Sequence, residues 1–338
     1  MSNPATTILD GNDPASIEQA AALLRHGELV GIPTETVYGL AADALNERAV
    51  AKVFEMKERP SFDPLIVHVP GMDEAEALAS FNKLAKRLAE AFWPGPLTLV
   101  LPRESNKQGK PIVPDLVTSG LDSVGLRMPD HPVPQALLEA CQRPLAAPSA
   151  NRFGSISPTL AQHVVDELDG RVPVVLNGGP CDRGVESTVV RINDSVEVLR
   201  LGALPVELIE EVAGQAVVVR AASSSPGIEA KPSPGMVERH YAPETEMRVF
   251  DSTASLSAFE PIGRWALVCV GAVPDVVERY VVLRNLSESG DLSFAAAALF
   301  STLRELDRMG LDGIAAVAVP NEGIGRAIND RLNRGSAG

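Results

Sequence analysis

Apolar residues recur at helical spacing in several segments of the first two thirds of the chain. One helix is predicted to end at Gly27, because glycine readily adopts the backbone conformation that closes a helix. Another is predicted to begin after Asn46, whose side chain suits an N-cap, and to end before Pro60. The segments with helical periodicity are residues 16–26, 46–59, 74–92 and 159–168.

Short runs rich in Val, Leu and Ile lie between these helices. Strands that alternate with helices indicate an α/β fold. The gap between the last two runs is too short for a crossover helix, so we expect those two strands to pair antiparallel and the sheet to be mixed. The predicted strands are residues 28–32, 64–69, 97–101, 123–128, 172–176, 187–192 and 196–201.

The composition changes after residue 220. From Ala221 to Gly235, nine of fifteen residues are Ser, Pro or Gly, which leaves too few apolar groups to pack. Beyond it, buried strands are predicted at residues 265–270, 280–283 and 314–319, with an amphipathic helix over 292–309. We therefore predict three parts: a catalytic domain of twisted mixed sheet over 1–220, a linker over 221–243, and a smaller Rossmann-like α/β domain over 244–338.

Composition narrows the class of protein. The chain has 338 residues, 45% hydrophobic and 22% charged, as in ordinary globular proteins. No apolar run approaches the ~18 residues of a membrane helix, and the N-terminus lacks the pattern of a signal peptide, so we expect a cytoplasmic protein that does not bind membranes. The three cysteines are widely spaced, which predicts small core residues and neither a disulfide framework nor a metal site.

The net charge of −14 argues against a protein whose whole surface binds nucleic acid. The chain contains no phosphate-binding GxxxxGK[ST] loop, no HExxH zinc motif and no GxSxG nucleophile elbow. None of the five histidines falls into the spacing of metal ligands. Covalent catalysis and a protein-held metal are therefore poorly supported.

Three clusters combine cations, hydroxyls and tight backbone. Lys57 and Arg59 end a predicted helix, where favourable interaction with the helix dipole is the ordinary explanation. A segment rich in Ser and Asn over 149–159 precedes a helix, and there capping competes with phosphate binding as the explanation. Arg127 lies on an otherwise apolar strand, where its guanidinium needs an anionic partner such as a carboxylate. His68, also on a strand, is more often a hydrogen-bonded core residue than a ligand.

Motifs in these clusters, together with others along nearly the whole chain, resemble in order and spacing the YrdC-like threonylcarbamoyl-AMP synthases. The final motif and the domain after it are similar to the long, two-domain form of that family. The matching segments are residues 33–40 (PTETVYGL), Lys57-x-Arg59-Pro60, 64–69 (PLIVHV), Ser149-x-Asn151, 186–189 (ESTV), 200–202 (RLG), 233–236 (SPGM) and 240–243 (HYAP).

The resemblance implies an enzyme that joins L-threonine, bicarbonate or CO2, and ATP into threonylcarbamoyl-AMP with release of pyrophosphate. It implies Mg²⁺ as the cofactor, held mainly by the ATP phosphates rather than by protein ligands. The product would pass to a tRNA threonylcarbamoyl-transfer complex, with a weak tRNA contact. By motif position, the threonine site is Thr36, His68, Arg127, Ala147 and Ser187, and the ATP site is Lys57, Arg59, Asp63, Ser123, Ser149, Asn151, Ser157, Arg200 and Tyr241.

Within that set, Lys57 and Arg59 are the expected catalytic cations. Asp63 departs from the asparagine that is usual in the family. A carboxylate there repels phosphate unless it meets Mg²⁺, a ribose hydroxyl or a cation. Tyr241 lies beyond the linker, so the linker is expected to fold back over the nucleotide.

Two other functions compete with this one. An RNA-binding module of the same fold is opposed by the charge of −14 and by only 4% aromatic residues. Carbamoyl transfer in hydrogenase maturation uses a related domain, but in much longer chains that also carry an acylphosphatase part and Cys-rich zinc modules, neither of which is visible in this sequence.

Overall fold

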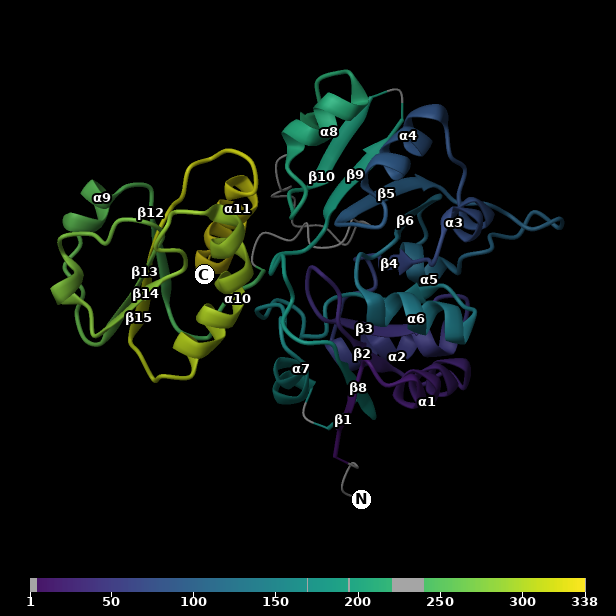
Figure 1. The fold of residues 1–338 in the computed structure, drawn as a ribbon, viewed down its shortest axis with the longest axis horizontal. Helices are drawn as coiled ribbons and strands as arrows, with labels where there is room; N and C mark the ends of the chain where they lie inside the picture. Colours follow the sequence, from purple (N-terminus) through teal and green to yellow (C-terminus); the bar gives the residue numbers. More distant parts are fainter. Residues whose placement is uncertain (1–4, 169, 194, 221–239, 338) are drawn as a thin grey trace.

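The computed structural model describes residues 5–168, 170–193, 195–220 and 240–337. Their strands form two separate sheets, an 11-stranded mixed sheet and a four-stranded parallel sheet, which makes the fold the expected α/β class (Figure 1). Most of the predicted linker, residues 221–239, lies outside the described residues.

The first sheet has the strand order β1-β8-β2-β3-β7-β4-β6-β5-β9-β10-β11. The last two long strands pair antiparallel, as the short gap between them predicts. The strands are β1 (Thr7–Asp10), β2 (Val30–Ile32), β3 (Gly39–Asp43), β4 (Ile66–His68), β5 (Leu97–Pro102), β6 (Ser123–Arg127), β7 (Leu145–Ala146), β8 (Val174–Asn177), β9 (Thr188–Ile192), β10 (Val196–Arg200) and β11 (Val218–Val219).

Helices cover this sheet unevenly. On the half built from β4, β5, β6, β9 and β10, one face packs into the main core, while the other carries a small apolar cluster of Ile66, Val100, Val189 and Leu199. Because side chains alternate along a strand, His68 and Arg127 point to the face that holds Ile66. The helices are α1 (Pro14–Arg25), α2 (Glu47–Lys57), α3 (Met72–Leu78), α4 (Lys83–Phe92), α5 (Asp115–Thr118), α6 (Pro132–Cys141), α7 (Ala161–Leu168) and α8 (Val206–Ala213).

The prediction of a single helix over 74–92 is wrong. The chain leaves helical geometry at Ala79, which forms an isolated bridge with Arg103, and Asn82 then caps α4 by accepting from the Ala85 amide at 2.8 Å. The helical periodicity continues across this break, so the pattern alone did not reveal it. Asn46, by contrast, caps α2 as predicted, accepting from the amides of Arg48 and Ala49.

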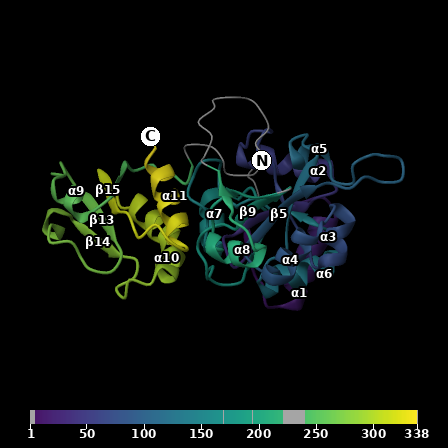
Figure 2. The same ribbon diagram turned by 90° about the horizontal axis from the view of Figure 1, so that it is seen from above.

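The second sheet has the order β12-β15-β13-β14 with every pair parallel, as expected for a small Rossmann-like layer. Its helices α10 and α11 lie between this sheet and the first domain (Figures 1 and 2). The elements are β12 (Met247–Phe250), α9 (Thr253–Ser257), β13 (Trp265–Cys269), the 3-10 helix η1 (Val277–Arg279), β14 (Val282–Asn285), α10 (Leu292–Asp307), β15 (Gly313–Val317) and α11 (Gly325–Ser336).

The two domains share a hydrophobic cluster. Val37, Ile156, Val185 and Ala203 of the first domain pack with residues of α10 and α11. The approach is close at Gly184, where an added Cβ would lie 2.4 Å from the Ala296 carbonyl oxygen. All three cysteines are buried and free, as predicted. None of the helices among the described residues is long and apolar enough to span a membrane.

Candidate functional site

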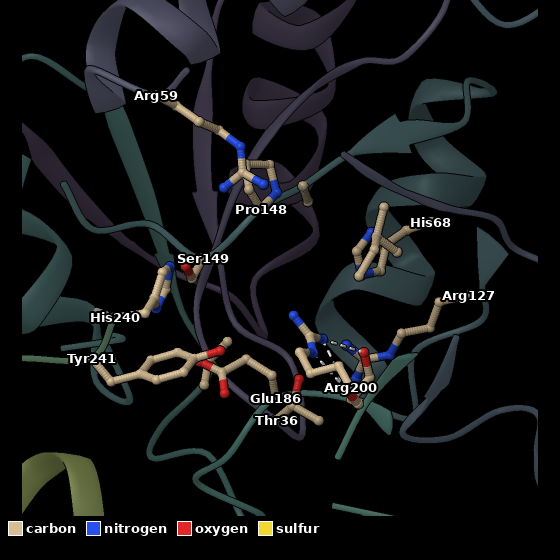
Figure 3. A pocket seen from close by; sticks show the side chains of 14 residues that line it. Thr36, Arg59, His68, Arg127, Pro148, Ser149, Glu186, Arg200, His240 and Tyr241 are labelled. Atoms are coloured by element: carbon tan, nitrogen blue, oxygen red, sulfur yellow. Dashed lines mark hydrogen bonds between the residues drawn. The ribbon is translucent and has the colours of Figure 1, made fainter. Parts of the chain in front are cut away.

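A cavity opens on the sheet face that carries Ile66 (Figure 3). The ends of β4, β6 and β10 meet there, and loops from distant parts of the chain complete the wall. Such convergence is typical of a binding site. The lining residues are Thr36, Val37, Arg59, Ile66, His68, Arg127, Ala147, Pro148, Ser149, Glu186, Ser187, Arg200, His240 and Tyr241.

His68 and Arg127 face the cavity from the carboxyl ends of two neighbouring parallel strands, where they are partners in the register. Burial and the charge of Arg127 lower the pKa of His68 to about 3. The imidazole is therefore neutral at pH 7, and its buried Nδ1 has no hydrogen-bond partner among the described residues. It is a neutral hydrogen-bonding group beside a fixed positive charge.

Glu35 stands next to Arg127. Its carboxylate lies 2.6 Å from the guanidinium, and both side chains are only 5% exposed. This contact lacks hydrogen-bond geometry, so charge holds it, while Nε of Arg127 donates to the Gly95 carbonyl at 3.3 Å. Arg127 thus enters the site with a carboxylate partner from its own chain.

Hydroxyl groups from separate loops line the cavity. Thr36, in the loop between β2 and β3, is fully buried and shares a hydrogen bond of 2.8 Å with the Thr34 hydroxyl. The Ser187 hydroxyl is 2.8 Å from that of Thr98 and accepts from Arg200 at 3.0 Å. Arg200 also donates to the Ser187 carbonyl, so this arginine fixes the loop that carries Ser187.

Lys57 ends α2 but does not line the cavity. Its side chain is 1% exposed, and Nζ donates to the backbone carbonyls of Ser149 and Asn151. Burial, with the charge of Arg59 second, holds the pKa of Lys57 well below its usual value. The geometry makes Lys57 the support of the 149–151 loop.

Arg59 does reach the cavity, and Asp63 is its partner. The two side chains form a buried ion pair at 2.8 Å, and the guanidinium also donates to the carbonyls of Asp63 and Pro64. The Asp63 carboxylate is thus paired with a cation, one of the three partners (Mg²⁺, a ribose hydroxyl or a cation) that would offset its repulsion of phosphate. The pair reduces the positive charge that Arg59 offers to a ligand.

The His240–Tyr241 segment closes the cavity on the side of the second domain (Figure 3). Tyr241 is buried in the left-handed region at φ 63° and stacks on Phe300 of α10 at 5.6 Å between ring centroids. Arg331 and Arg334 of α11 lie 4.7 and 4.9 Å from its ring. The tyrosine hydroxyl is buried with no hydrogen-bond partner among the described residues.

Positive charge gathers at this site although the whole chain is acidic. Arg59, Arg127 and Arg200 line the cavity, and burial together with Arg334, Arg59 and Lys57 keeps the pKa of His240 well below its usual value. An anionic ligand suits such a cavity. Within the described ranges, no three His, Cys, Asp or Glu side chains group as metal ligands do.

Two family models together match most of the chain. A family described as "Telomere recombination" matches residues 22–202, and one described as "Threonylcarbamoyl-AMP synthase, C-terminal domain" matches residues 204–337. A threonylcarbamoyl-AMP synthase of Bacillus subtilis is 40% identical over 341 residues, covering 98% of this chain and 96% of the relative. The chain belongs to the threonylcarbamoyl-AMP synthase family.

Other members of the threonylcarbamoyl-AMP synthase family agree with this assignment. The enzyme of Pyrococcus abyssi is 39% identical over 331 residues, with 95% of this chain and 94% of the relative covered. A crystal structure of P. abyssi Sua5 complexed with L-threonine matches with a TM-score of 0.87 and 37% identity, covering 99% of this chain and 98% of that one. The second family model starts before α8, which packs with α4 in the first domain, so the domain limits set at 220 and 244 stay a prediction.

The structure brings most of the residues assigned from the family motifs into one cavity. Nine line it: Thr36, Arg59, His68, Arg127, Ala147, Ser149, Ser187, Arg200 and Tyr241. Five do not: Lys57, Asp63, Ser123, Asn151 and Ser157. Ser123 begins β6 at the end away from Arg127, and Ser157 donates to Glu186 at 2.5 Å.

Several lining residues were not predicted from the sequence. Glu186 and His240 stand in matched motifs directly before Ser187 and Tyr241, so the motifs themselves were the available signal. Val37, Ile66 and Pro148 are apolar and carried no chemical signal. Glu35 belongs to the first motif, but nothing in the sequence pairs it with Arg127.

Proposed function

We propose that this chain forms threonylcarbamoyl-AMP from L-threonine, bicarbonate or CO2, and ATP. Membership of the family and a cavity that gathers cations, hydroxyls and a neutral histidine support this function. The single observation that carries it is the pairing of His68 with Arg127 at adjacent strand ends, in one cavity with Arg59 and Arg200. An amino-acid carboxylate fits the first pair, and nucleotide phosphates fit the other arginines.

The reaction needs no protein nucleophile. The threonine amine, after losing a proton, forms a C–N bond to CO2, and one carbamate oxygen then attacks the α-phosphorus as the bond to pyrophosphate breaks. Starting from bicarbonate, one water is also released. The work left to the protein is alignment of two anions and neutralisation of phosphate charge.

The residues divide this work between them. We assign Arg127 to the threonine carboxylate, with Thr36, His68, Ser187 and the Ala147 backbone around its polar groups. Arg59, Ser149, Arg200 and Tyr241 face the nucleotide. Lys57 and Ser157 do not line the cavity and act indirectly. Lys57 supports the 149–151 loop, and Ser157 donates a hydrogen bond to Glu186.

Asn151, Asp63 and Ser123 complete the proposed nucleotide site without lining the cavity. Asn151 donates within its own loop to the carbonyls of Arg152 and Ser155. We therefore assign Asn151 the role of supporting this loop. Ser123 lies on the same strand face as Arg127, since residues two apart on a strand share a face.

Mg²⁺ is the proposed cofactor, held mainly by the ATP phosphates. When bound, it neutralises phosphate charge. A phosphate-held Mg²⁺ needs few protein ligands, which fits a cavity that the described residues line with arginines and one carboxylate, Glu186.

We further propose a cytoplasmic enzyme that hands its product to a tRNA threonylcarbamoyl-transfer complex, with at most a weak tRNA contact of its own. An RNA-binding module without catalysis is the second candidate, and only the local arginine cluster favours it. Salt-dependent retention of tRNA without any turnover would support that module.

The deciding measurement is pyrophosphate release from ATP and Mg²⁺, with and without L-threonine and with and without bicarbonate. We expect release that requires both. Release with neither would indicate an unrelated ATPase and overturn the proposal. Arg127→Ala is expected to raise chiefly the threonine KM and Arg59→Ala chiefly the ATP KM; the opposite dependence would refute the assignment of the two subsites.

A further inference from the structure

Helix α11 of the second domain sends one side chain to the wall of the cavity. Arg331 is fully buried, and it is the largest side chain in that state among the described residues. A buried guanidinium is costly unless charges and hydrogen bonds compensate it. Its partners therefore show what it is for.

Arg331 joins three parts of the site. Its Nε donates to the Glu186 carboxylate at 2.8 Å, and one terminal nitrogen donates to the Leu201 carbonyl at 2.8 Å. The guanidinium also lies 4.7 Å from the ring of Tyr241. On its own helix, the Asp330 carboxylate accepts from the remaining terminal nitrogen.

The three parts of the site that Arg331 joins belong to the proposed nucleotide side of the cavity. Glu186 lines it, and its second oxygen accepts from Ser157 at 2.5 Å. Leu201 follows Arg200 directly, and Arg200 holds the Ser187 loop. Although burial opposes the ionised carboxylate, Arg331 and Arg200 keep the pKa of Glu186 below its usual value. The carboxylate therefore stays charged between two arginines.

We propose that Arg331 is a positioning residue for the nucleotide half of the site, so that the second domain completes the active site of the first. This rests on the function proposed above. Arg331 holds the Glu186 carboxylate, the backbone after Arg200 and the ring of Tyr241 in one arrangement. It acts through those groups and does not itself line the cavity.

A merely structural bridge between domains is the alternative, and α11 provides a matched control for it. Arg326 on the same helix pairs with Glu207 of the first domain at 3.1 Å, but the two side chains are 34% and 43% exposed and neither lines the cavity. Loss of that pair removes an interdomain contact while leaving the site intact. We expect Arg326→Ala to bind and turn over ATP like the parent.

The test compares Arg331→Met, Arg331→Lys and Arg326→Ala. For Arg331→Met we expect the ATP KM, and the Kd of a non-hydrolysable ATP analogue measured by calorimetry, to rise at least about tenfold, with the threonine KM changed less than about threefold. Arg331→Lys keeps the charge and should recover part of the loss. Glu186→Gln should raise the same constants, and its combination with Arg331→Met should cost less than the product of the two effects.

Equal loss toward ATP and threonine, or analogue binding as tight as in Arg326→Ala, would overturn the positioning role. If Arg331→Met does not fold, Arg331→Lys and Glu186→Gln decide by the same two constants. A parent enzyme that binds the analogue but releases no pyrophosphate in response to threonine would instead refute the proposed function, so the two failures are distinguishable.

Discussion

At the residue scale, the site is built from buried charges that face other buried charges. Arg127 meets Glu35, Arg59 meets Asp63, and Arg331 meets Glu186. Removing one partner of such a pair leaves an uncompensated charge, which costs far more than losing an exposed ion pair. At the two arginines that line the cavity, Glu35 and Asp63 therefore tune how much positive charge Arg127 and Arg59 present to an anionic substrate.

Asp63 provides a test of that tuning. Replacing it by asparagine, the residue usual in this family, leaves Arg59 its hydrogen bonds to the backbone carbonyls of Asp63 and Pro64 but removes the neutralising charge. We expect Asp63→Asn to lower the ATP KM about threefold to tenfold, which steady-state kinetics would detect. Asp115→Asn, at an ion pair with Arg103 outside the cavity, is the control. A higher KM in Asp63→Asn would contradict this account.

The lowered pKa of His68 predicts that the stability of the protein depends on pH. Its pKa is near 6.5 when unfolded and about 3 in the fold, where burial and Arg127 oppose the proton. Between these pH values the unfolded chain binds more protons at His68 than the folded chain does. The contribution of His68 to the free energy of unfolding is therefore complete above about pH 6.5 and decreases as the pH falls toward 3.

The size of that dependence can be checked by urea unfolding. From pH 7 to pH 5 this histidine should remove about 2 kcal/mol of unfolding free energy, and His68→Gln should lose that much less over the same interval. His163, whose pKa burial lowers to about 4, contributes to the slope in both proteins. An identical slope in the two proteins would show that His68 does not titrate in this way.

At the element scale, the strand ends and the loops after them place the chemistry. β4 and β6 bring His68 and Arg127 side by side, and the end of β10 runs against the loop that begins β9. Gly202 lies at this crossing, where an added Cβ would sit 2.3 to 2.4 Å from the backbone of residues 186–188. Only glycine allows the two segments to approach this closely.

Gly202→Ala should therefore displace the loop that carries Glu186 and Ser187. We expect kcat/KM to fall at least about tenfold and the unfolding free energy to drop by about 1–3 kcal/mol, as overpacking of backbone against backbone does. Gly71→Ala is the comparison, because its nearest neighbour is the flexible carboxylate of Glu74 at 3.1 Å. Parent-like activity and stability in Gly202→Ala would show that the loop adapts.

At the scale of the whole molecule, the second domain is part of the catalytic unit. Its helices bury Val37, Ile156, Val185 and Ala203 of the first domain, and ion pairs such as Arg304–Glu167 at 3.0 Å cross the border. Apolar surface on this scale is unstable in water when it is uncovered. The two domains depend on each other for packing as well as for the site.

Deleting everything after residue 235 tests this dependence. We expect the shortened chain to lose pyrophosphate release, because Tyr241 and Arg331 are removed, and to aggregate or melt at lower temperature, because the shared cluster is exposed. Calorimetric melting and the activity assay would be compared with the full chain. A shortened chain that folds and is fully active would refute the role of the second domain.

The sequence by itself determined the class of fold, the caps of helices such as the one Asn46 starts, and the antiparallel pairing of β9 and β10, because these depend on local periodicity and chain length. The resemblance to the family also assigned nine of the lining residues, seven of them within the matched motifs. The break between α3 and α4 and helix α11 were not predicted, because helical periodicity continues across the break, and α11 has only a few apolar residues, Ala327, Ile328 and Leu332, to mark its buried face.

Only the tertiary structure decided which charges meet. Arg331 and Glu186 are separated by 145 residues, and Arg127 and Glu35 come from different strands and loops. Local sequence patterns do not reveal such pairs, because an arginine has the same preference for helix or strand whichever anion it contacts in the fold. The partner is chosen by the packing of α11 on the first domain and by the strand order that brings the loop between β2 and β3 to the end of β6, and these arise only when the whole chain folds.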